Sequence, residues 1–182
     1  MFPSGYTKYA SASKKQGSSP EILLARYATR FKMAGQLESI SLLDHSKDSE
    51  NLYLHVMRIS FAYSALESLE EYLGKKVNLK NLELAKQIRL CSTKTKSFFL
   101  TQSGTKLENQ LSKFFTFKSD SDIRHFCTAI RHSMFHGQFN PYSSGLNSKK
   151  GVLLMERVEK MLFTSMNETS EILFLKLAKE NK

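Results

Sequence analysis

Apolar residues recur at every third or fourth position along most of the chain, and this spacing constrains the fold more than any other feature of the sequence. Within 22–40, one such series of apolar positions is Ile22, Leu23, Tyr27, Phe31, Ala34, Leu37 and Ile40. One face of an α-helix has this spacing. The sequence contains only 8 Gly and 3 Pro among 182 residues, too few turn-forming residues for a many-stranded sandwich or barrel. We therefore expect an all-α fold, an up-and-down bundle of four to five main helices.

Residues typical of helix ends mark the boundaries of these helices. Pro20 and Glu21 suit the start of the first helix, and Gly74 suits the end of the second. The run Ser119–Asp122 supplies N-cap residues for a helix that Gly137 closes. The segment 97–105 fits either a short strand or packing under a loop. The predicted helices cover about 21–40, 51–73, 79–90, 107–115, 123–136 and 152–178.

The two ends of the chain differ in composition. Residues 1–20 contain five Ser, two Gly, two Pro and three Lys with few aliphatic residues, a composition that favours a mobile segment. Over the whole chain 41% of residues are hydrophobic, which is enough for a core. We predict a flexible N-terminal tail over 1–20 and a single helical domain over 21–180.

The net charge is strongly positive. The 27 Lys and Arg exceed the 17 Asp and Glu by 10, and such a surplus favours a polyanionic partner such as RNA, DNA or an acidic membrane face. Much of the surplus falls in 75–113. There the basic residues fit phosphate contacts as well as they fit solubilisation of a helix. The predicted RNA-binding set is Lys75, Lys76, Lys80, Lys86, Arg89, Lys94 and Lys96, together with Arg124.

The cysteine content and the hydropathy pattern predict the compartment. Cys91 and Cys127 cannot form a disulfide framework, and neither has the spacing of a metal ligand. No uncharged apolar run reaches the roughly 18 residues that a bilayer span needs. We expect a cytoplasmic protein without a membrane partner, a metal or a cofactor.

The segment 123–137 concentrates the residues with catalytic chemistry. It contains three of the five histidines, and His125, His132 and His136 fall within about 40° of one another on an ideal helix. Arg131 lies to one side of this histidine face. A cation beside histidines is suited to holding a phosphodiester and moving protons. The alternative interpretation is a solvated helix face without a function. Elsewhere the sequence lacks the signatures of P-loop, zincin and elbow-type hydrolases.

The stretch Arg131-His132-Ser133-Met134-Phe135-His136-Gly137 resembles the R-x4-6-H motif of the HEPN superfamily (higher eukaryotes and prokaryotes nucleotide-binding domains). The segment 61–73 is similar to an early helix of that family, in which an acidic residue is frequent. Some members carry Tyr two residues after the motif histidine, where this chain has Gln138. The resemblance therefore does not extend to control by modification of that tyrosine.

The resemblance implies a metal-independent endoribonuclease that attacks RNA through its own 2′-OH. By the same resemblance Arg131 holds the phosphate, His136 is the acid–base histidine and His132 orients the pair. It also implies a homodimer, and a toxin or defence effector that an inhibitory or antitoxin protein partner holds in check. The alternatives are a non-catalytic HEPN-like module that binds RNA, nucleotides or proteins, and a helical adaptor.

Two further residues are candidates for a supporting role. His125 shares the histidine face, and Glu67 is placed to pair with Arg131 across the bundle. Ser60, Ser64, Glu67 and Glu71 also fit an ordinary solvated stripe, and this second interpretation is the one we favour for Glu67.

Overall fold

The computed structural model describes residues 2–15, 21–118 and 120–180, and the regular secondary structure in these ranges is α-helical. Within them the only bridge of β type is an isolated antiparallel pair between Lys80 and Asp122. The prediction of an all-α fold is confirmed. The helices are α1 (Tyr6–Lys15), α2 (Ile22–Gln36), α3 (Lys47–Leu73), α4 (Leu82–Arg89), α5 (Thr93–Thr101), α6 (Thr105–Thr116), α7 (Arg124–Phe135), α8 (Pro141–Ser144) and α9 (Lys149–Glu180).

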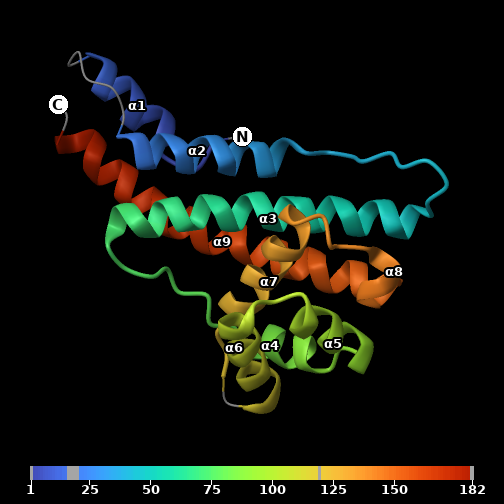
Figure 1. Ribbon diagram of the computed structural model, residues 1–182. Helices are drawn as coiled ribbons and strands as arrows, with labels where there is room; N and C mark the ends of the chain where they lie inside the picture. The colour runs from blue at the N-terminus through green and yellow to red at the C-terminus, as the bar shows by residue number, and fades with distance from the viewer. Residues whose placement is uncertain (1, 16–20, 119, 181–182) are drawn as a thin grey trace.

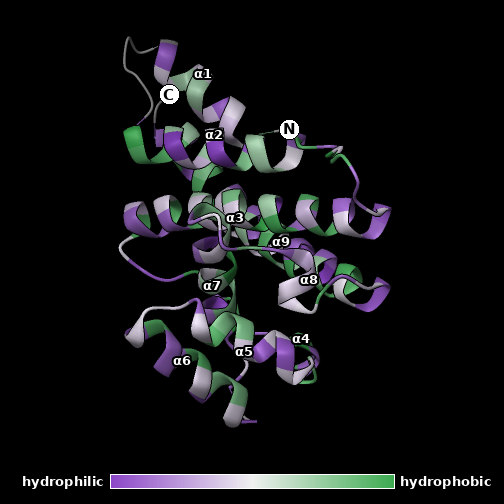
Figure 2. Ribbon diagram, turned by 45° about the vertical axis from the view of Figure 1, so that its right-hand side comes forward, coloured by the Kyte–Doolittle hydropathy of each residue, from purple (hydrophilic) through white to green (hydrophobic). Residues whose placement is uncertain are grey.

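The two longest helices, α3 and α9, form the centre of the molecule (Figure 1). They run in the same direction, while α2 lies antiparallel to α3. The short helices α4 to α6 gather on one side, and α7 runs from them to α3. In a strictly up-and-down bundle, successive long helices run in opposite directions. Here α9 runs parallel to α3, because the chain from α4 to α8 returns to the starting end of α3 before α9 begins, so the predicted up-and-down order is not strictly kept. Hydrophobic and hydrophilic residues alternate along the same helices in Figure 2, as amphipathic helices require.

Several helix ends follow the local signals in the sequence. The Ser46 side chain accepts a hydrogen bond from the backbone N–H of Ser49 and caps α3, and Gly74 ends this helix with φ of 62°. The segment that fitted a strand or a loop is instead helix α5, because Ser92 caps its start and Phe98 and Phe99 are buried. Pro20, Ser119 and residues 16–20 of the predicted tail lie outside the described residues.

Neighbours surround α3 on several sides, because α2, α7 and α9 all contact it. Ser60 and Ser64 are consequently buried, and each hydroxyl donates to the carbonyl four residues earlier. Arg30 of α2 reaches over this face and donates to the Ser64 carbonyl and to the Ser68 hydroxyl, at 3.1 and 2.9 Å. The predicted solvated stripe on α3 is therefore wrong at its serines, because α2 covers them.

A buried carboxylate joins three helices away from the histidine segment. Glu159 of α9 is 7% exposed, and its Oε2 lies 2.7 Å from Nδ1 of His55 on α3. Its Oε1 lies 3.0 Å from the Arg58 guanidinium, which also donates to the carbonyl of Ala34 on α2. These contacts satisfy the buried charge, as a buried carboxylate requires.

The described part of the N-terminal segment is not a tail. Helix α1 packs on α9, where Tyr9 is 4% exposed and stacks on Phe174 with 5.5 Å between ring centroids. Tyr6 meets the same ring edge-on at 5.3 Å. A Cβ on Gly5, whose φ is +80°, would lie 2.9 Å from the Phe174 Cβ. The prediction of a flexible 1–20 tail is thus wrong for α1, because two tyrosines supply the apolar surface that aliphatic residues do not.

Tyr9→Ala is expected to lower the thermal midpoint by about 6–12 °C. Truncating a buried aromatic side chain costs about 3 kcal/mol, and each kcal/mol corresponds to about 2–4 °C in a domain of this size. Thermal denaturation followed by circular dichroism measures the change. Lys8→Ala, at an exposed position of the same helix, is the control, and equal midpoints for both variants would show that α1 does not pack as described.

Candidate functional site

One face of helix α7 is buried against the rest of the molecule, and the opposite face is accessible to solvent. Phe126, Cys127, Ala129, Ile130 and Ser133 are buried, and the helix packs against α3. After Phe135 the chain turns at Gly137, whose φ is +66°. The N–H groups of Gln138 and Phe139 both donate to the Ser133 carbonyl, at 2.8 and 2.9 Å. This closed turn fixes the C-terminal end of α7, where the candidate motif lies.

Arg131 is held by a carboxylate of the neighbouring helix. Its Nη1 donates to Oε2 of Glu67 on α3 at 2.6 Å. The guanidinium carbon lies 5.8 Å from the ring centroid of Tyr63, within the range of a cation–π contact. The side chains of Arg131 and Glu67 are 31% and 40% exposed. The pairing of Glu67 with Arg131, which we considered beside the solvated stripe, is therefore observed, and the Glu67 side chain keeps access to solvent as well.

His132 and His136 lie against each other at the end of α7. Their ring centroids are 4.3 Å apart with 43° between the ring planes. Burial, the neighbouring His136 and the Arg131 charge lower the pKa of His132 from its usual 6.5. His136 is exposed. The arrangement therefore places an imidazole that favours its neutral form beside a second, accessible imidazole and a fixed cation.

An aromatic pair lies next to the histidines along the chain. Phe135 is 55% exposed, and its ring meets Phe61 of α3 edge-on with centroids 6.0 Å apart. Phe139, in contrast, is buried and packs on Tyr53 and Phe98. Phe135 is thus the aromatic side chain that this end of α7 presents to solvent.

His125 does not join the cluster. It lies in the first turn of α7 and is half-buried. Among the contacts of the described residues, none connects its ring to Arg131, Glu67, His132 or His136. The predicted face of three histidines is therefore reduced to two, because seven residues of helix separate His125 from His132, about 10 Å along the axis.

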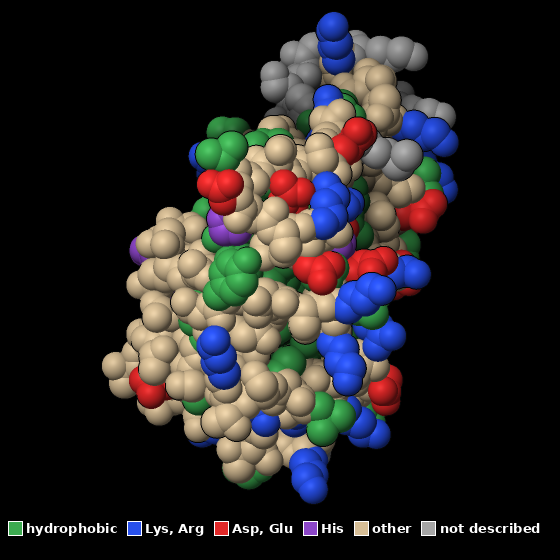
Figure 3. Space-filling view, turned by 90° about the vertical axis from the view of Figure 1, so that its right-hand side faces the viewer, with side chains coloured by type: hydrophobic (Ala, Val, Ile, Leu, Met, Phe, Trp, Pro, Cys, Tyr) green, Lys and Arg blue, Asp and Glu red, His purple; other side chains and the backbone are tan. Residues whose placement is uncertain are grey.

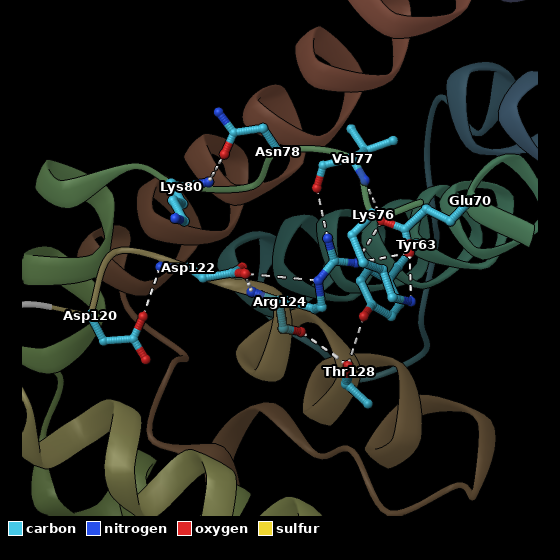
Figure 4. Close-up of polar contacts among 10 residues, drawn as sticks. All are labelled: Tyr63, Glu70, Lys76, Val77, Asn78, Lys80, Asp120, Asp122, Arg124 and Thr128. Carbon is cyan, nitrogen blue, oxygen red and sulfur yellow. Dashed lines mark hydrogen bonds and ion pairs between the residues drawn. The ribbon is translucent and has the colours of Figure 1, made fainter. Parts of the chain in front are cut away.

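Arg124 is part of an internal network (Figure 4). Its Nη1 lies 2.8 and 3.0 Å from the two oxygens of Glu70, and its Nη2 donates to the Val77 carbonyl at 2.7 Å. Glu70 is 4% exposed and also accepts from the Val77 N–H and from Lys76. Arg124 fixes the chain after α3 against α7, and we remove it from the predicted RNA-binding set.

Arg89 has a structural role as well. Its guanidinium donates to the carbonyls of Phe114, Lys118 and Asp120 and lies 4.7 Å from the ring centroid of Phe114. These contacts tie α4 to the end of α6 and occupy the donors that a phosphate would need. Arg89 therefore also leaves the predicted set.

The remaining lysines are distributed over separate parts of the surface. Lys75 and Lys76 line a hollow of about 260 Å³ with Glu67, Glu70 and Glu71, so they lie next to the carboxylate that holds Arg131. Lys96 lies 6.0 Å from the Phe115 ring centroid, and Lys80, Lys86 and Lys94 are exposed on the connection before α4, on α4 and on α5. Of the predicted lysines, Lys75 and Lys76 are the two that share a hollow with a residue of the candidate site.

Two residues of the site were not singled out from the sequence. Tyr63 lies under the Arg131 guanidinium, and its hydroxyl accepts a hydrogen bond from Thr128 at 2.9 Å. Burial raises the pKa of Tyr63 to about 12, so the phenol stays neutral. Phe61 supports Phe135. The spacing of Tyr63 and Glu67, four residues apart on α3, was the signal that pointed to a shared face.

No family model, curated protein or solved structure matches this chain. Within the ranges that the structure describes, no group of three His, Cys, Asp or Glu side chains is placed to hold a metal ion. No helix in those ranges combines the length and apolar character that a membrane span needs.

Proposed function

We propose that the protein is a HEPN-type endoribonuclease whose site is the exposed end of α7. The observation that carries this proposal is the paired His132 and His136 rings beside an arginine that Glu67 holds at 2.6 Å. Acid–base chemistry on a phosphodiester needs a proton acceptor, a proton donor and a cation for the phosphate. These three groups come from six consecutive residues.

In the proposed reaction, neutral His132 accepts the proton of a ribose 2′-OH while the 2′-oxygen attacks the adjacent phosphorus. His136 donates a proton to the departing 5′-oxygen, and the Nη donors of Arg131 that Glu67 does not engage bind the non-bridging oxygens. Two imidazoles in contact resist holding a proton each, which favours one neutral and one charged ring. The products carry a 2′,3′-cyclic phosphate and a 5′-hydroxyl.

A direct assay tests the proposal. A set of end-labelled single-stranded RNAs of varied sequence is incubated with the protein in the presence and absence of EDTA, together with DNA of the same sequences. We expect cleavage of RNA that persists in EDTA, and no cleavage of DNA, which lacks the 2′-OH. Binding of every RNA without cleavage would instead favour the non-catalytic binding module.

The proposed reaction predicts how His132 titrates. Because the charge of His136 contributes to the low pKa of His132, His136→Gln should raise the pKa of His132 towards 6.5. The site needs His132 neutral, so cleavage by the wild type should increase with pH through a midpoint below 6.5 on the acid side of its profile. Nuclear magnetic resonance of the imidazole protons measures the pKa without relying on activity. An unchanged His132 pKa in His136→Gln would contradict the pairing of the rings.

The same proposal predicts a homodimer with the α7 helices near the twofold axis. Arg131 and His136 are about 140° apart on an ideal helix, so one motif faces a substrate from one side, whereas two motifs across an axis enclose it. Light scattering after size-exclusion chromatography should give twice the mass of the 20.8 kDa chain. A monomer that cleaves RNA at micromolar concentration would contradict this prediction.

A further inference from the structure

A hollow with an apolar lining lies where α9 begins, away from the candidate site. It encloses about 570 Å³ between the end of α4, the start of α5, the loop before α9 and the first turns of α9. Leu90 and Leu153 both line it and are 84% and 50% exposed. Leu146 and Leu154 contribute buried surface to the same lining. Two accessible leucines in one concave surface are suited to an apolar ligand.

Close backbone packing forms part of the lining. A Cβ on Gly151 would collide with the carbonyl oxygen of Leu146, so the start of α9 touches the preceding loop directly. Gly145, with φ of +69°, brings the same loop against Ser92 and Thr95 at the start of α5. These contacts hold the hollow open before any ligand binds, which lowers the entropic cost of binding.

The charges around the hollow are of one sign. Its lining includes Lys150 and Arg157 and no acidic residue. Arg157 donates to Oε1 of Gln87 at 2.7 Å, and both residues also line a neighbouring hollow of about 720 Å³ with Lys80 and Lys160. Figure 3 shows Lys and Arg side chains along one edge of the lower half of the molecule, with acidic and hydrophobic side chains among them. The two hollows together form a groove that carries basic residues alone in its smaller half and both basic residues and two carboxylates, Glu83 and Glu168, in its larger half.

We propose that this groove binds a peptide segment of a partner protein in which aliphatic side chains alternate with Asp or Glu. Leu90 and Leu153 would contact the aliphatic side chains, and Lys150 and Arg157 would pair with the carboxylates. RNA fits these observations less well, because no aromatic side chain is among the residues that line either hollow, and single strands bind largely by stacking on aromatic rings.

A random ten-residue peptide library displayed on phage tests the proposal with the intact chain. We expect selected sequences to be enriched in Leu, Ile, Val or Met next to Asp or Glu. A fluorescein-labelled peptide of the consensus sequence should then lose at least about tenfold in affinity for Leu90→Ser, Leu153→Ser and Lys150→Glu. Fluorescence anisotropy measures the affinity, and far-ultraviolet circular dichroism checks that each variant is folded.

Matched controls use similar side chains outside the groove. Leu43→Ser changes a leucine that is 90% exposed, and Lys106→Glu changes an exposed lysine of α6; both should bind the consensus peptide like the wild type. Selection of no consensus, or of basic or aromatic sequences, would overturn the proposal. So would equal losses in the control variants, or a labelled oligouridine that binds the wild type and not the groove variants.

Discussion

His136→Ala is expected to lower the rate of RNA cleavage by about 10²- to 10⁴-fold, the usual contribution of an acid–base group. Arg131→Ala should lose a similar factor, because it withdraws the cation that meets the charge developing on the phosphate. Both side chains lie off the buried face of α7, so the variants should fold. Single-turnover cleavage of a labelled RNA by saturating protein measures the chemical step separately from binding.

His125→Ala is the matched control for these variants. It removes a histidine of the same helix that makes no contact with the candidate site in the described residues, and its cleavage rate should equal that of the wild type. Glu67→Gln should give an intermediate loss, because the amide keeps a hydrogen-bond acceptor for Arg131 but not the charge that holds the guanidinium. If His136→Ala cuts as fast as His125→Ala, the catalytic site lies elsewhere in the molecule.

Substitution of Lys75 and Lys76 separates binding from chemistry. Both lysines line the hollow that includes Glu67, so alanine at these positions should weaken RNA binding and flatten its salt dependence while the single-turnover rate stays the same. The same substitutions at Lys86 and Lys94 serve as the comparison, since the structure gives these side chains no contact with the candidate site.

The helical class and several helix ends follow from local sequence. Spacing of apolar residues, the Gly74 stop and the turn at Gly137 act over a few residues, and the structure has them where the sequence predicts them. The packing of α1 does not follow in this way, because Tyr6 and Tyr9 both pack on Phe174, which lies more than 160 residues further along the chain. The direction of α9 relative to α3 likewise depends on how the chain from α4 to α8 folds back.

In the candidate site, too, some contacts follow from local sequence and others depend on residues distant in the chain. Helical periodicity places His132 and His136 on one face, and their ring contact follows from a spacing of four residues. The roles of the basic residues depend on partners distant in sequence: Arg131 meets Glu67, Arg124 meets Glu70, and Arg89 meets carbonyls in the last turns of α6 and just after it. The spacing of residues along one helix does not predict which arginine will pair with a carboxylate of another helix. It therefore does not distinguish an arginine with a structural role from one that can bind a ligand.

Glu70→Ala is expected to destabilise the protein by about 3 kcal/mol, which corresponds to a thermal midpoint about 6–12 °C lower. The side chain of Glu70 is 3% exposed and that of Arg124 is 13% exposed, so removal of the carboxylate leaves a guanidinium that water reaches poorly. The Val77 N–H loses its acceptor at the same time. Chemical denaturation by urea measures the free energy of unfolding.

Glu71→Ala provides the control, because Glu71 is the adjacent and exposed carboxylate of the same helix, and its loss should change the stability by less than about 0.5 kcal/mol. Glu70→Leu combined with Arg124→Met should be more stable than Glu70→Ala alone, since replacing both charges leaves neither one buried without a partner. Equal stability of Glu70→Ala and Glu71→Ala would show that the Glu70–Arg124 pair does not stabilise the fold, and Arg124 would again be a candidate for binding RNA. A large difference between them instead means that Arg124 holds the segment after α3 in place and is not available to a ligand.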